Sequence, residues 1–277
     1  MAEQSTQEAA KPILVIGGTG KTGRRVAQRL KARDVPVRIG SRSGEPAFDW
    51  QDQTTWQPVL QGVGAVYITY YPDLGFPGAA EAIGAFAKQA VRSGAGRLVL
   101  LSGRGEEQAQ VSEQALKDAT DDWTIVRASW FNQNFSENFL LEPVLSGEIA
   151  LPAGDAVEPF VDAEDIADVA VAALTEEGHA GHLYELSGPR LLTFADTAAE
   201  ISAALGRQVR YVAITAEQYI DVLAENGVPT EFVELFTTTL DGRNAHLTDG
   251  VQRALGREPR DFRDYARETA ATGVWNV

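Results

Sequence analysis

The stretch that decides the fold is ILVIGGTGKTGRRVAQRL, residues 13–30. It opens with a short, uniformly apolar run that predicts a buried parallel strand. A glycine-rich turn follows at residues 17–23. Apolar side chains then recur at helical spacing from Val26 to Leu30, with arginines on the opposite face. Strand, glycine turn and helix in this order predict a dinucleotide-binding unit.

The glycines of this turn have separate roles. Gly17 makes the tight turn, Gly20 lets the backbone approach a pyrophosphate, and Gly23 lets helix and strand pack closely. Free N–H groups at the helix start and the helix dipole then favour the phosphate charge. Because Lys21 follows Gly20 directly, the loop is too short for a kinase-type phosphate loop. We predict cofactor contacts throughout the turn, at Gly17, Gly18, Thr19, Gly20, Lys21, Thr22 and Gly23.

The composition excludes several classes of function. A net charge of −15 over 277 residues leaves no basic surface for nucleic acid. The charge is compatible with a cationic small-molecule substrate, although an acidic surface that only keeps a cytosolic protein in solution is the simpler interpretation. The lack of cysteine excludes disulfides and thiolate catalysis. No apolar run has membrane-spanning length and residues 1–12 lack a signal-peptide pattern, so we expect a cytoplasmic enzyme without membrane contact and with a flexible tail at 1–12.

The residues after the second predicted strand, 35–39, indicate which cofactor binds. NAD-binding units carry an acidic residue here that holds the ribose 2′-hydroxyl. This chain instead reads Gly40, Ser41, Arg42, Ser43. An arginine between two hydroxyls would hold the 2′-phosphate of NADP(H) through charge-assisted hydrogen bonds. We therefore predict NADP(H), bound by Ser41, Arg42 and Ser43, with an ordinary polar turn as the alternative.

Residues 48–50, Phe-Asp-Trp, are expected to end a short third strand. Asp49 would accept a hydrogen bond from the adenine amino group, and Trp50 would pack beside the adenine ring. The alternative is that Asp49 caps a helix at 54–60.

Strands and helices alternate over the following residues and predict a Rossmann-type, doubly wound parallel sheet of the α/β class. The expected strands are at 65–70, 97–101 and 123–126, and the expected helices at 78–93 and 111–119. Ligands bind at the carboxyl ends of such strands. Thr69, Tyr70, Ser102 and Gly103 lie there and are predicted to contact the cofactor.

The segment that follows the sixth predicted strand changes character. Residues 128–139, ASWFNQNFSENF, combine aromatic and amide side chains in a way that is typical of a small-molecule pocket. We predict a substrate pocket formed by Tyr71, Trp130, Phe131 and Asn134. The alternative is that the aromatic side chains fill core.

The rest of the chain predicts a smaller, mixed α+β lobe over the cleft. Expected elements are strands at 148–151, 159–161, 183–186 and 209–214, and helices at 165–174, capped by Asp162 or Asp165, and at 194–205. We assign 13–150 to the cofactor-binding core, to which 160–190 returns, and 191–277 to a mainly helical substrate lobe. His179 and His182 lack a third ligand nearby, which favours a solvated turn over zinc, so no metal is predicted. A homodimer is left open.

Proton-transfer residues of the short-chain dehydrogenases, which share this scaffold, are incomplete here. That family normally carries Tyr-x-x-x-Lys, and none of the tyrosines of this chain has a lysine four residues later. Ser102 occupies the serine position. Glu113 and Lys117 reproduce the spacing, with glutamate in place of tyrosine. We expect their helix to face solvent, and we therefore interpret the matching spacing as a coincidence.

Several motifs carry a resemblance to a known family. The chain resembles an atypical short-chain dehydrogenase of the NmrA-like group over nearly its full length. Within that group it is similar to the ergot alkaloid biosynthesis reductases of the festuclavine and agroclavine dehydrogenase type. The matching segments are GGTGKTG, FDW, RLVLLSGRG, WTIVRASWFNQNFSE and the LDGRN around Asp241. The resemblance implies an NADP-linked reductase that acts on a C=N (iminium) bond. The group also contains quinone and dye reductases and catalytically silent redox sensors.

The missing tyrosine agrees with that implied chemistry. Reduction of a ketone creates an alkoxide that needs a proton, whereas hydride addition to an iminium ion gives a neutral amine. We predict an NADPH-dependent imine or iminium reductase in which Ser102, Trp130 and Tyr71 position the small-molecule substrate. The alternatives are a quinone or carbonyl reductase with Ser102 or water as proton donor, and a non-catalytic NADP(H) sensor that binds a protein partner.

Overall fold

The computed structural model describes residues 10–225, 230 and 233–277, so most of the predicted tail lies outside the described residues. Within them, a parallel sheet has the strand order β2-β1-β3-β4-β5-β8. Its strands are β1 (Ile13–Ile16), β2 (Val37–Gly40), β3 (Ala65–Ile68), β4 (Arg97–Gly103), β5 (Trp123–Ala128) and β8 (His182–Leu186). The order reverses at β1, which lies between β2 and β3. This reversal confirms the predicted doubly wound, Rossmann-type fold.

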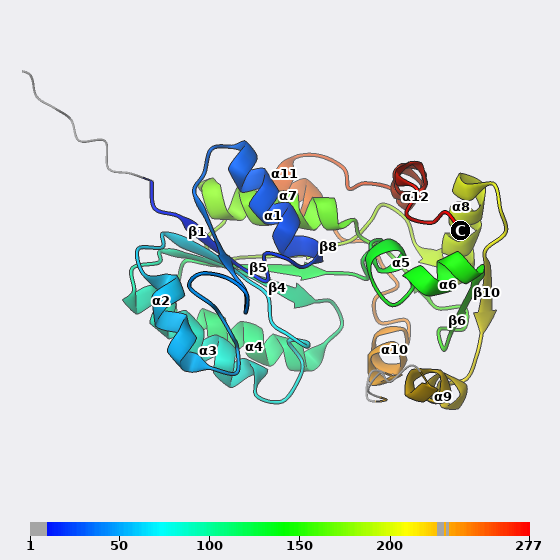
Figure 1. Cartoon of the computed structure of the whole chain (residues 1–277), viewed down its shortest axis with the longest axis horizontal. Helices are drawn as coiled ribbons and strands as arrows, with labels where there is room; N and C mark the ends of the chain where they lie inside the picture. The colour runs from blue at the N-terminus through cyan, green and yellow to red at the C-terminus, as the bar shows by residue number, and fades with distance from the viewer. Residues whose placement is uncertain (1–9, 226–229, 231–232) are drawn as a thin grey trace, which may run out of the picture.

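Helices cover both faces of this sheet (Figure 1). One layer contains α1 (Lys21–Ala32), α7 (Ala163–Thr175) and α11 (Gly250–Leu255). The other contains α2 (Trp56–Leu60), α3 (Ala79–Arg92) and α4 (Glu107–Lys117). Strand β1 packs against both layers, with Val15 in one core and Leu14 in the other, which explains its uninterrupted apolar run.

The predicted third strand does not form. Asp49 makes only an isolated bridge to Asp52. The Phe48 N–H donates to the carbonyl of Ser41, 2.9 Å away, so the segment satisfies its backbone within its own loop. Phe48 and Trp50 pack instead against Phe86 of α3, with ring centroids 5.7 Å and 5.2 Å from that ring. The aromatic residues that suggested a strand are therefore core contacts of a loop. The short 3₁₀ helix η1 (Gln53–Thr55) follows.

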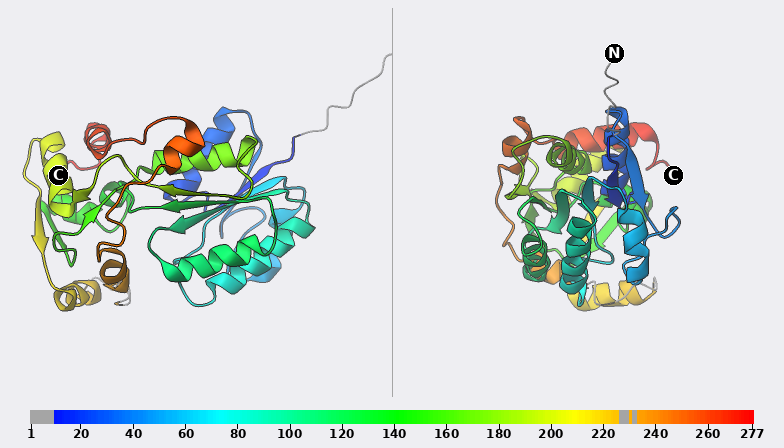
Figure 2. Two further views of the ribbon diagram at one scale, coloured as in Figure 1. Left: turned by 180° about the vertical axis from the view of Figure 1, so that it is seen from behind. Right: turned by 90° about the vertical axis from the view of Figure 1, so that its left-hand side faces the viewer.

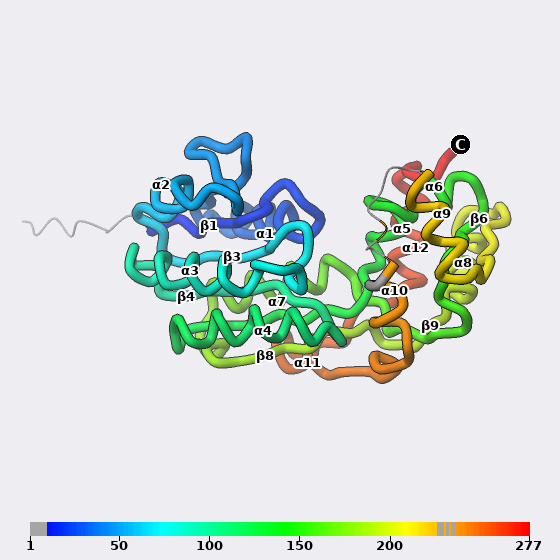
Figure 3. Tube along the Cα trace, turned by 90° about the horizontal axis from the view of Figure 1, so that it is seen from below, coloured from blue at the N-terminus to red at the C-terminus, as the bar shows by residue number. Residues whose placement is uncertain are grey.

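A second body lies beyond the carboxyl ends of the strands, as Figures 2 and 3 show. In it β6 (Glu148–Leu151) pairs with β10 (Arg210–Ala213), and β7 (Val157–Glu158) pairs with β9 (Leu192–Thr193). Its helices are α5 (Asn134–Glu137), α6 (Leu141–Ser146), α8 (Phe194–Leu205), α9 (Ala216–Glu225), α10 (Val233–Thr239) and α12 (Phe262–Thr272). A separate core around Phe135, Phe160, Phe194 and Trp275 holds these elements together.

The division of the chain differs in detail from the predicted boundaries. Residues 134–151 pack in the core of the second body, while α11 returns to the sheet. The strand expected at 159–161 is replaced by β7 and by a bridge between Val161 and Phe131. Residues 226–229 and 231–232 of the predicted lobe lie outside the described residues. No helix in the described part of the chain has the length and apolar character needed to cross a membrane.

Candidate functional site

The glycine turn has the geometry of a phosphate cradle. Helix α1 starts after Gly20, and no side chain caps its first N–H groups. A Cβ on Gly23 would lie 2.2 Å from the carbonyl oxygen of Gly17, so only glycine allows this approach of helix to turn. The turn follows β1 at the point where the strand order reverses. An uncapped helix start at this position fits the pyrophosphate of a dinucleotide.

Lys21 joins this turn to the predicted pocket. Its Nζ donates to Oδ1 of Asn134 at 2.7 Å and lies 5.6 Å from the centre of the Phe131 ring. Burial lowers the pKa of Lys21 to about 8, against the attraction of Glu137, which raises it. A partly desolvated ammonium group beside the turn would attract an anionic cofactor strongly. The structure thus brings together three residues predicted from two separate motifs, the glycine turn and the aromatic segment 128–139.

Ion pairs hold α1 against α5 of the second body and against α7, which packs on the sheet. The Arg25 guanidinium contacts Glu137 of α5 at 2.7 Å and Glu164 of α7 at 2.5 Å. The arginine face of α1, predicted only as polar, therefore anchors the second body beside the glycine turn.

The residues predicted for the 2′-phosphate lie together after β2. Ser41 and Ser43 have their hydroxyl oxygens 3.4 Å apart. The Arg42 side chain is exposed and makes no hydrogen bond or ion pair with another described residue. It is free to bind an anion.

The residues predicted to contact adenine also interact within the protein. The Trp50 indole N–H donates to the Thr69 carbonyl at 3.0 Å, and its ring packs 5.0 Å from that of Tyr70. The Asp49 carboxylate accepts from the Gln51 N–H at 3.0 Å. The alternative role of Asp49 as a helix cap is wrong, because Asp52 caps the 3₁₀ helix η1 by accepting from Thr54 N–H. Thr69 donates to the Ile16 carbonyl at 3.1 Å and joins β1 to β3.

Ser102 belongs to a buried ionic network. Its hydroxyl donates to Oε1 of Glu113 at 2.7 Å. Arg127 pairs with the other oxygen of Glu113 at 2.5 Å and with Glu185 at 2.7 Å. Glu113 is only 1% exposed, so the expectation that it faces solvent is wrong. Its partners on β4 and β5 are what allow a carboxylate to be buried on α4. Lys117 lies 4.9 Å from the centre of the Trp123 ring, away from this network.

The predicted pocket residues lie in three different surroundings, with Phe131 and Asn134 beside Lys21. Trp130 packs among aromatic rings of the second body, 5.1 Å from Phe236, and its indole N–H donates to the Thr239 hydroxyl at 3.3 Å. Tyr71 is 75% exposed, so its ring is not enclosed by the rest of the described structure.

A carboxyl pair that the sequence did not reveal lies beside Gly103. A Cβ on Gly103 would lie 2.0 Å from Oε1 of Glu106, so the carboxyl group covers that residue. Burial, the charge of Asp73 and a hydrogen bond with Asp73 raise the pKa of Glu106 to about 8. Glu106 therefore keeps its proton near neutral pH. The polar segment RGEEQ gives no sign of this pairing.

Glu158 is a second missed residue. It is 1% exposed, and neither carboxyl oxygen has a hydrogen-bond partner among the described residues. Burial raises its pKa to about 8, with Arg104 lowering it and Asp241 raising it. A signal existed, because Glu158 is the one charged residue in the segment AVEPFV.

The histidine turn is more ordered than expected. His179 is buried, and its Nδ1 lies 2.9 Å from the Tyr184 hydroxyl, so the prediction of a solvated turn is wrong for this residue. Over the described ranges, no three His, Cys, Asp or Glu side chains are placed to hold a metal ion together.

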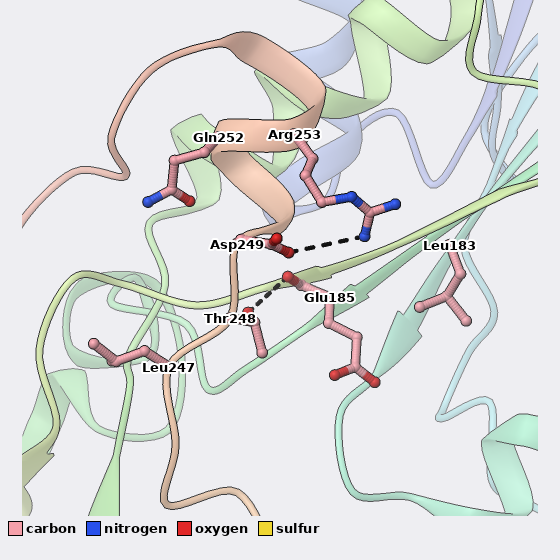
Figure 4. Close-up of a pocket in the computed structure, with 7 residues that line it drawn as sticks. All are labelled: Leu183, Glu185, Leu247, Thr248, Asp249, Gln252 and Arg253. Atoms are coloured by element: carbon pink, nitrogen blue, oxygen red, sulfur yellow. Dashed lines mark hydrogen bonds and ion pairs between the residues drawn. The ribbon is translucent and has the colours of Figure 1, made fainter.

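A surface groove of about 620 Å³ lies beside β8 and α11, and Glu185 of the Ser102 network is one of its lining residues (Figure 4). Thr248 donates to the Glu185 carbonyl at 2.7 Å along its floor, and Arg253 faces Asp249 at 3.8 Å. None of the predicted cofactor or pocket residues lines it.

The doubly wound sheet, the uncapped glycine turn at its switch point and the body beyond its carboxyl ends define a dinucleotide-binding protein of the Rossmann type. Residues 107–268 match the sequence profile of the NmrA-like family. The chain is 34% identical over 283 residues to the uncharacterized oxidoreductase YesF of Bacillus subtilis (strain 168), covering 95% of this chain and 98% of that protein. The protein belongs to the NmrA-like family.

Two further matches agree with this assignment. Agroclavine dehydrogenase of Claviceps fusiformis is 30% identical over 286 residues, covering 95% of this chain and 98% of that protein. The crystal structure of Citrobacter sp. triphenylmethane reductase complexed with NADP(H) superposes with a TM-score of 0.74 at 22% identity, covering 93% of this chain and 99% of that chain. The resemblance inferred from the sequence motifs is confirmed, and the structural match shows the shared fold.

Proposed function

We propose that the protein is an NAD(P)H-dependent oxidoreductase that prefers NADPH and reduces the C=N bond of a small iminium or imine substrate. The observation that carries the proposal is the state of Ser102. Its hydroxyl hydrogen is donated to Glu113, which Arg127 holds in place. No tyrosine hydroxyl in the described structure forms a hydrogen bond with Ser102 in place of the missing acid. This arrangement suits an iminium ion, including an imine that is already protonated, because it accepts hydride and becomes a neutral amine without needing a proton from the protein.

The chain's own residues would hold and orient the reactants. The glycine turn and Lys21 would bind the pyrophosphate, and Arg42 with its neighbouring serines would bind the 2′-phosphate. When bound, the reduced nicotinamide supplies the hydride. Trp130 would place the substrate beside it, so that catalysis depends on orientation. Support also comes from the names of the relatives, which include an oxidoreductase and a dehydrogenase, and from the NADP(H) complex of a fold neighbour.

One observation favours a second candidate, a quinone or carbonyl reductase. Glu106 is protonated near pH 7 and covers Gly103, which is predicted to contact the cofactor. Such a carboxyl group could supply the proton that a ketone or quinone needs.

The experiment is NADPH oxidation measured with cyclic imines, N-alkyl iminium ions and quinones. We expect the iminium ions to react fastest and Ser102→Ala to keep most of that activity. Preferred turnover of quinones, with loss of activity in Glu106→Gln, would favour the second candidate. Binding of NADPH without turnover of any substrate would favour a cofactor-sensing role.

A further inference from the structure

Three segments far apart in the sequence meet around Glu158 of β7. The segment after α10, residues 240–246, crosses the loop that follows β4. Arg243 donates to the Gly105 carbonyl at 3.0 Å, and the Asn244 side chain donates to the Arg104 carbonyl at 3.2 Å. Gly105 has a φ of +78°, and a Cβ there would lie 2.6 Å from the Asn244 amide nitrogen. Glycine is therefore what allows this crossing, which brings the charge of Asp241 to bear on Glu158.

The Glu158 carboxyl group is buried without a partner even though a guanidinium is near. Arg104 is itself 4% exposed, and its charge lowers the pKa of Glu158 and so favours the carboxylate form. Its donors are directed elsewhere, to the Ser129 hydroxyl at 3.0 Å and to His246 at 2.7 Å and 3.2 Å. A buried carboxyl group with no hydrogen bond is destabilising, and proteins rarely keep one without a role. Its two oxygens are enclosed by the protein and have no hydrogen-bond partner among the described residues.

The position of Glu158 connects it to the predicted substrate segment. Three residues later, the Val161 N–H donates to the Trp130 carbonyl at 2.8 Å. The Trp130 indole donates to Thr239, which precedes Asp241 by two residues. The aromatic ring predicted to orient the substrate and the unpartnered carboxyl group thus lie on segments that are hydrogen-bonded to each other.

We propose that Glu158 is the anionic anchor that binds the positively charged nitrogen of the substrate, and that it selects organic cations over neutral carbonyl compounds of the same shape. The proposal rests on the proposed function, because it names the class of substrate for that site. Apolar surroundings strengthen the attraction between a carboxylate and a cation. The aromatic face of Trp130 would add a cation–π contribution.

Binding of a cation would also move a proton. Because the pKa of Glu158 is about 8, with Arg104 and Asp241 as the charged groups acting on it, the free protein holds this carboxyl mostly neutral at pH 7. A bound cation favours the carboxylate, so the proton leaves as the cation binds. The affinity for a permanently charged cation should therefore rise between pH 6 and pH 8.

The test is calorimetric titration of the cofactor-loaded protein with N,N-dimethyl-tetrahydroisoquinolinium, a permanently charged compound without a reducible C=N bond. The variants are Glu158→Gln, Glu158→Asp and the exposed control Glu142→Gln. We expect Glu158→Gln to weaken binding roughly 10- to 100-fold, as for loss of a charge-assisted contact. Titration in two buffers with different ionisation enthalpies should show proton release for wild type and Glu142→Gln, and none for Glu158→Gln. Glu158→Asp, which keeps the charge, should keep the proton release.

The outcomes separate this proposal from the proposed function. Cation binding that depends on Glu158, without turnover of any iminium, would support the anchor and count against the reductase. Equal cation affinity and equal proton release in wild type and Glu158→Gln would overturn the anchor, even if iminium reduction is observed. Equal weakening of the cation and of a neutral isostere would overturn it as well, because it would show a purely structural role.

Discussion

Replacing Glu158 with glutamine should change how the stability of the protein depends on pH. The carboxyl group has a pKa of about 8 in the folded protein, against an ordinary value of 4.5. Between these two values the folded state holds a proton that the unfolded chain has released. The wild-type free energy of unfolding therefore falls as pH rises through this window, by about 1.4 kcal/mol per pH unit from this group. The stability that Glu158 contributes is fully present below the ordinary pKa of 4.5 and fully lost above the folded-state pKa of about 8.

Glu158→Gln removes this term, so the variant should gain stability relative to wild type as pH rises. The relative gain between pH 4.5 and pH 7 should be ~3 kcal/mol at most. The change with pH is the test, rather than the difference at one pH, because the glutamine amide is also buried without partners.

The assay is urea unfolding followed by tryptophan fluorescence at pH 5, 6, 7 and 8, without cofactor. The exposed control Glu142→Gln should keep the wild-type pH dependence. A difference between wild type and Glu158→Gln that stays constant from pH 5 to pH 8 would refute the reasoning.

Further predictions concern the cofactor site. Gly20→Val should fold, because a Cβ at this position meets only the Gly17 carbonyl oxygen, at 3.2 Å, but it should not bind NADPH in a fluorescence titration. Gly23→Ala should instead lose thermal stability, because its Cβ would lie 2.2 Å from the same oxygen. Arg42→Ala should weaken NADPH by roughly 1.5–3 kcal/mol and leave NADH nearly unchanged, and equal loss of both would remove its role in selectivity. Wild-type affinity for NADPH should fall above pH 8 as Lys21 loses its charge, and a Lys21→Met variant that shows the same fall would contradict this.

What the sequence predicted well was determined locally. The turn at 17–23 could be predicted because strand, glycines and helix are adjacent, so their geometry depends on few distant contacts. The alternation of strands and helices was likewise sufficient for the sheet. The third strand failed because Phe48 and Trp50 find partners on α3, and side-chain packing there outweighed strand pairing.

The buried acidic residues could not be predicted, for a different reason. Glu113 is buried because Arg127 pairs with its charge and Ser102, on a separate strand, donates a hydrogen bond to it, and such partners are visible only after folding. Glu158 stood out in its apolar segment. Its lack of a partner, however, depends on where Arg104 directs its donors, which no sequence pattern encodes.

The most direct test of acid-free hydride transfer is a deuterium-transfer experiment. NADPH carrying deuterium at C4 would be incubated with an N-alkyl iminium ion and either wild-type protein or Ser102→Ala. We predict an amine with deuterium on the carbon next to nitrogen, formed by Ser102→Ala at no less than about a third of the wild-type rate, because a true proton donor contributes ~10²–10⁴-fold. Two results together would contradict the account. The amine would carry no deuterium, and deuterium would instead be transferred to a ketone or quinone in a reaction that Ser102→Ala abolishes.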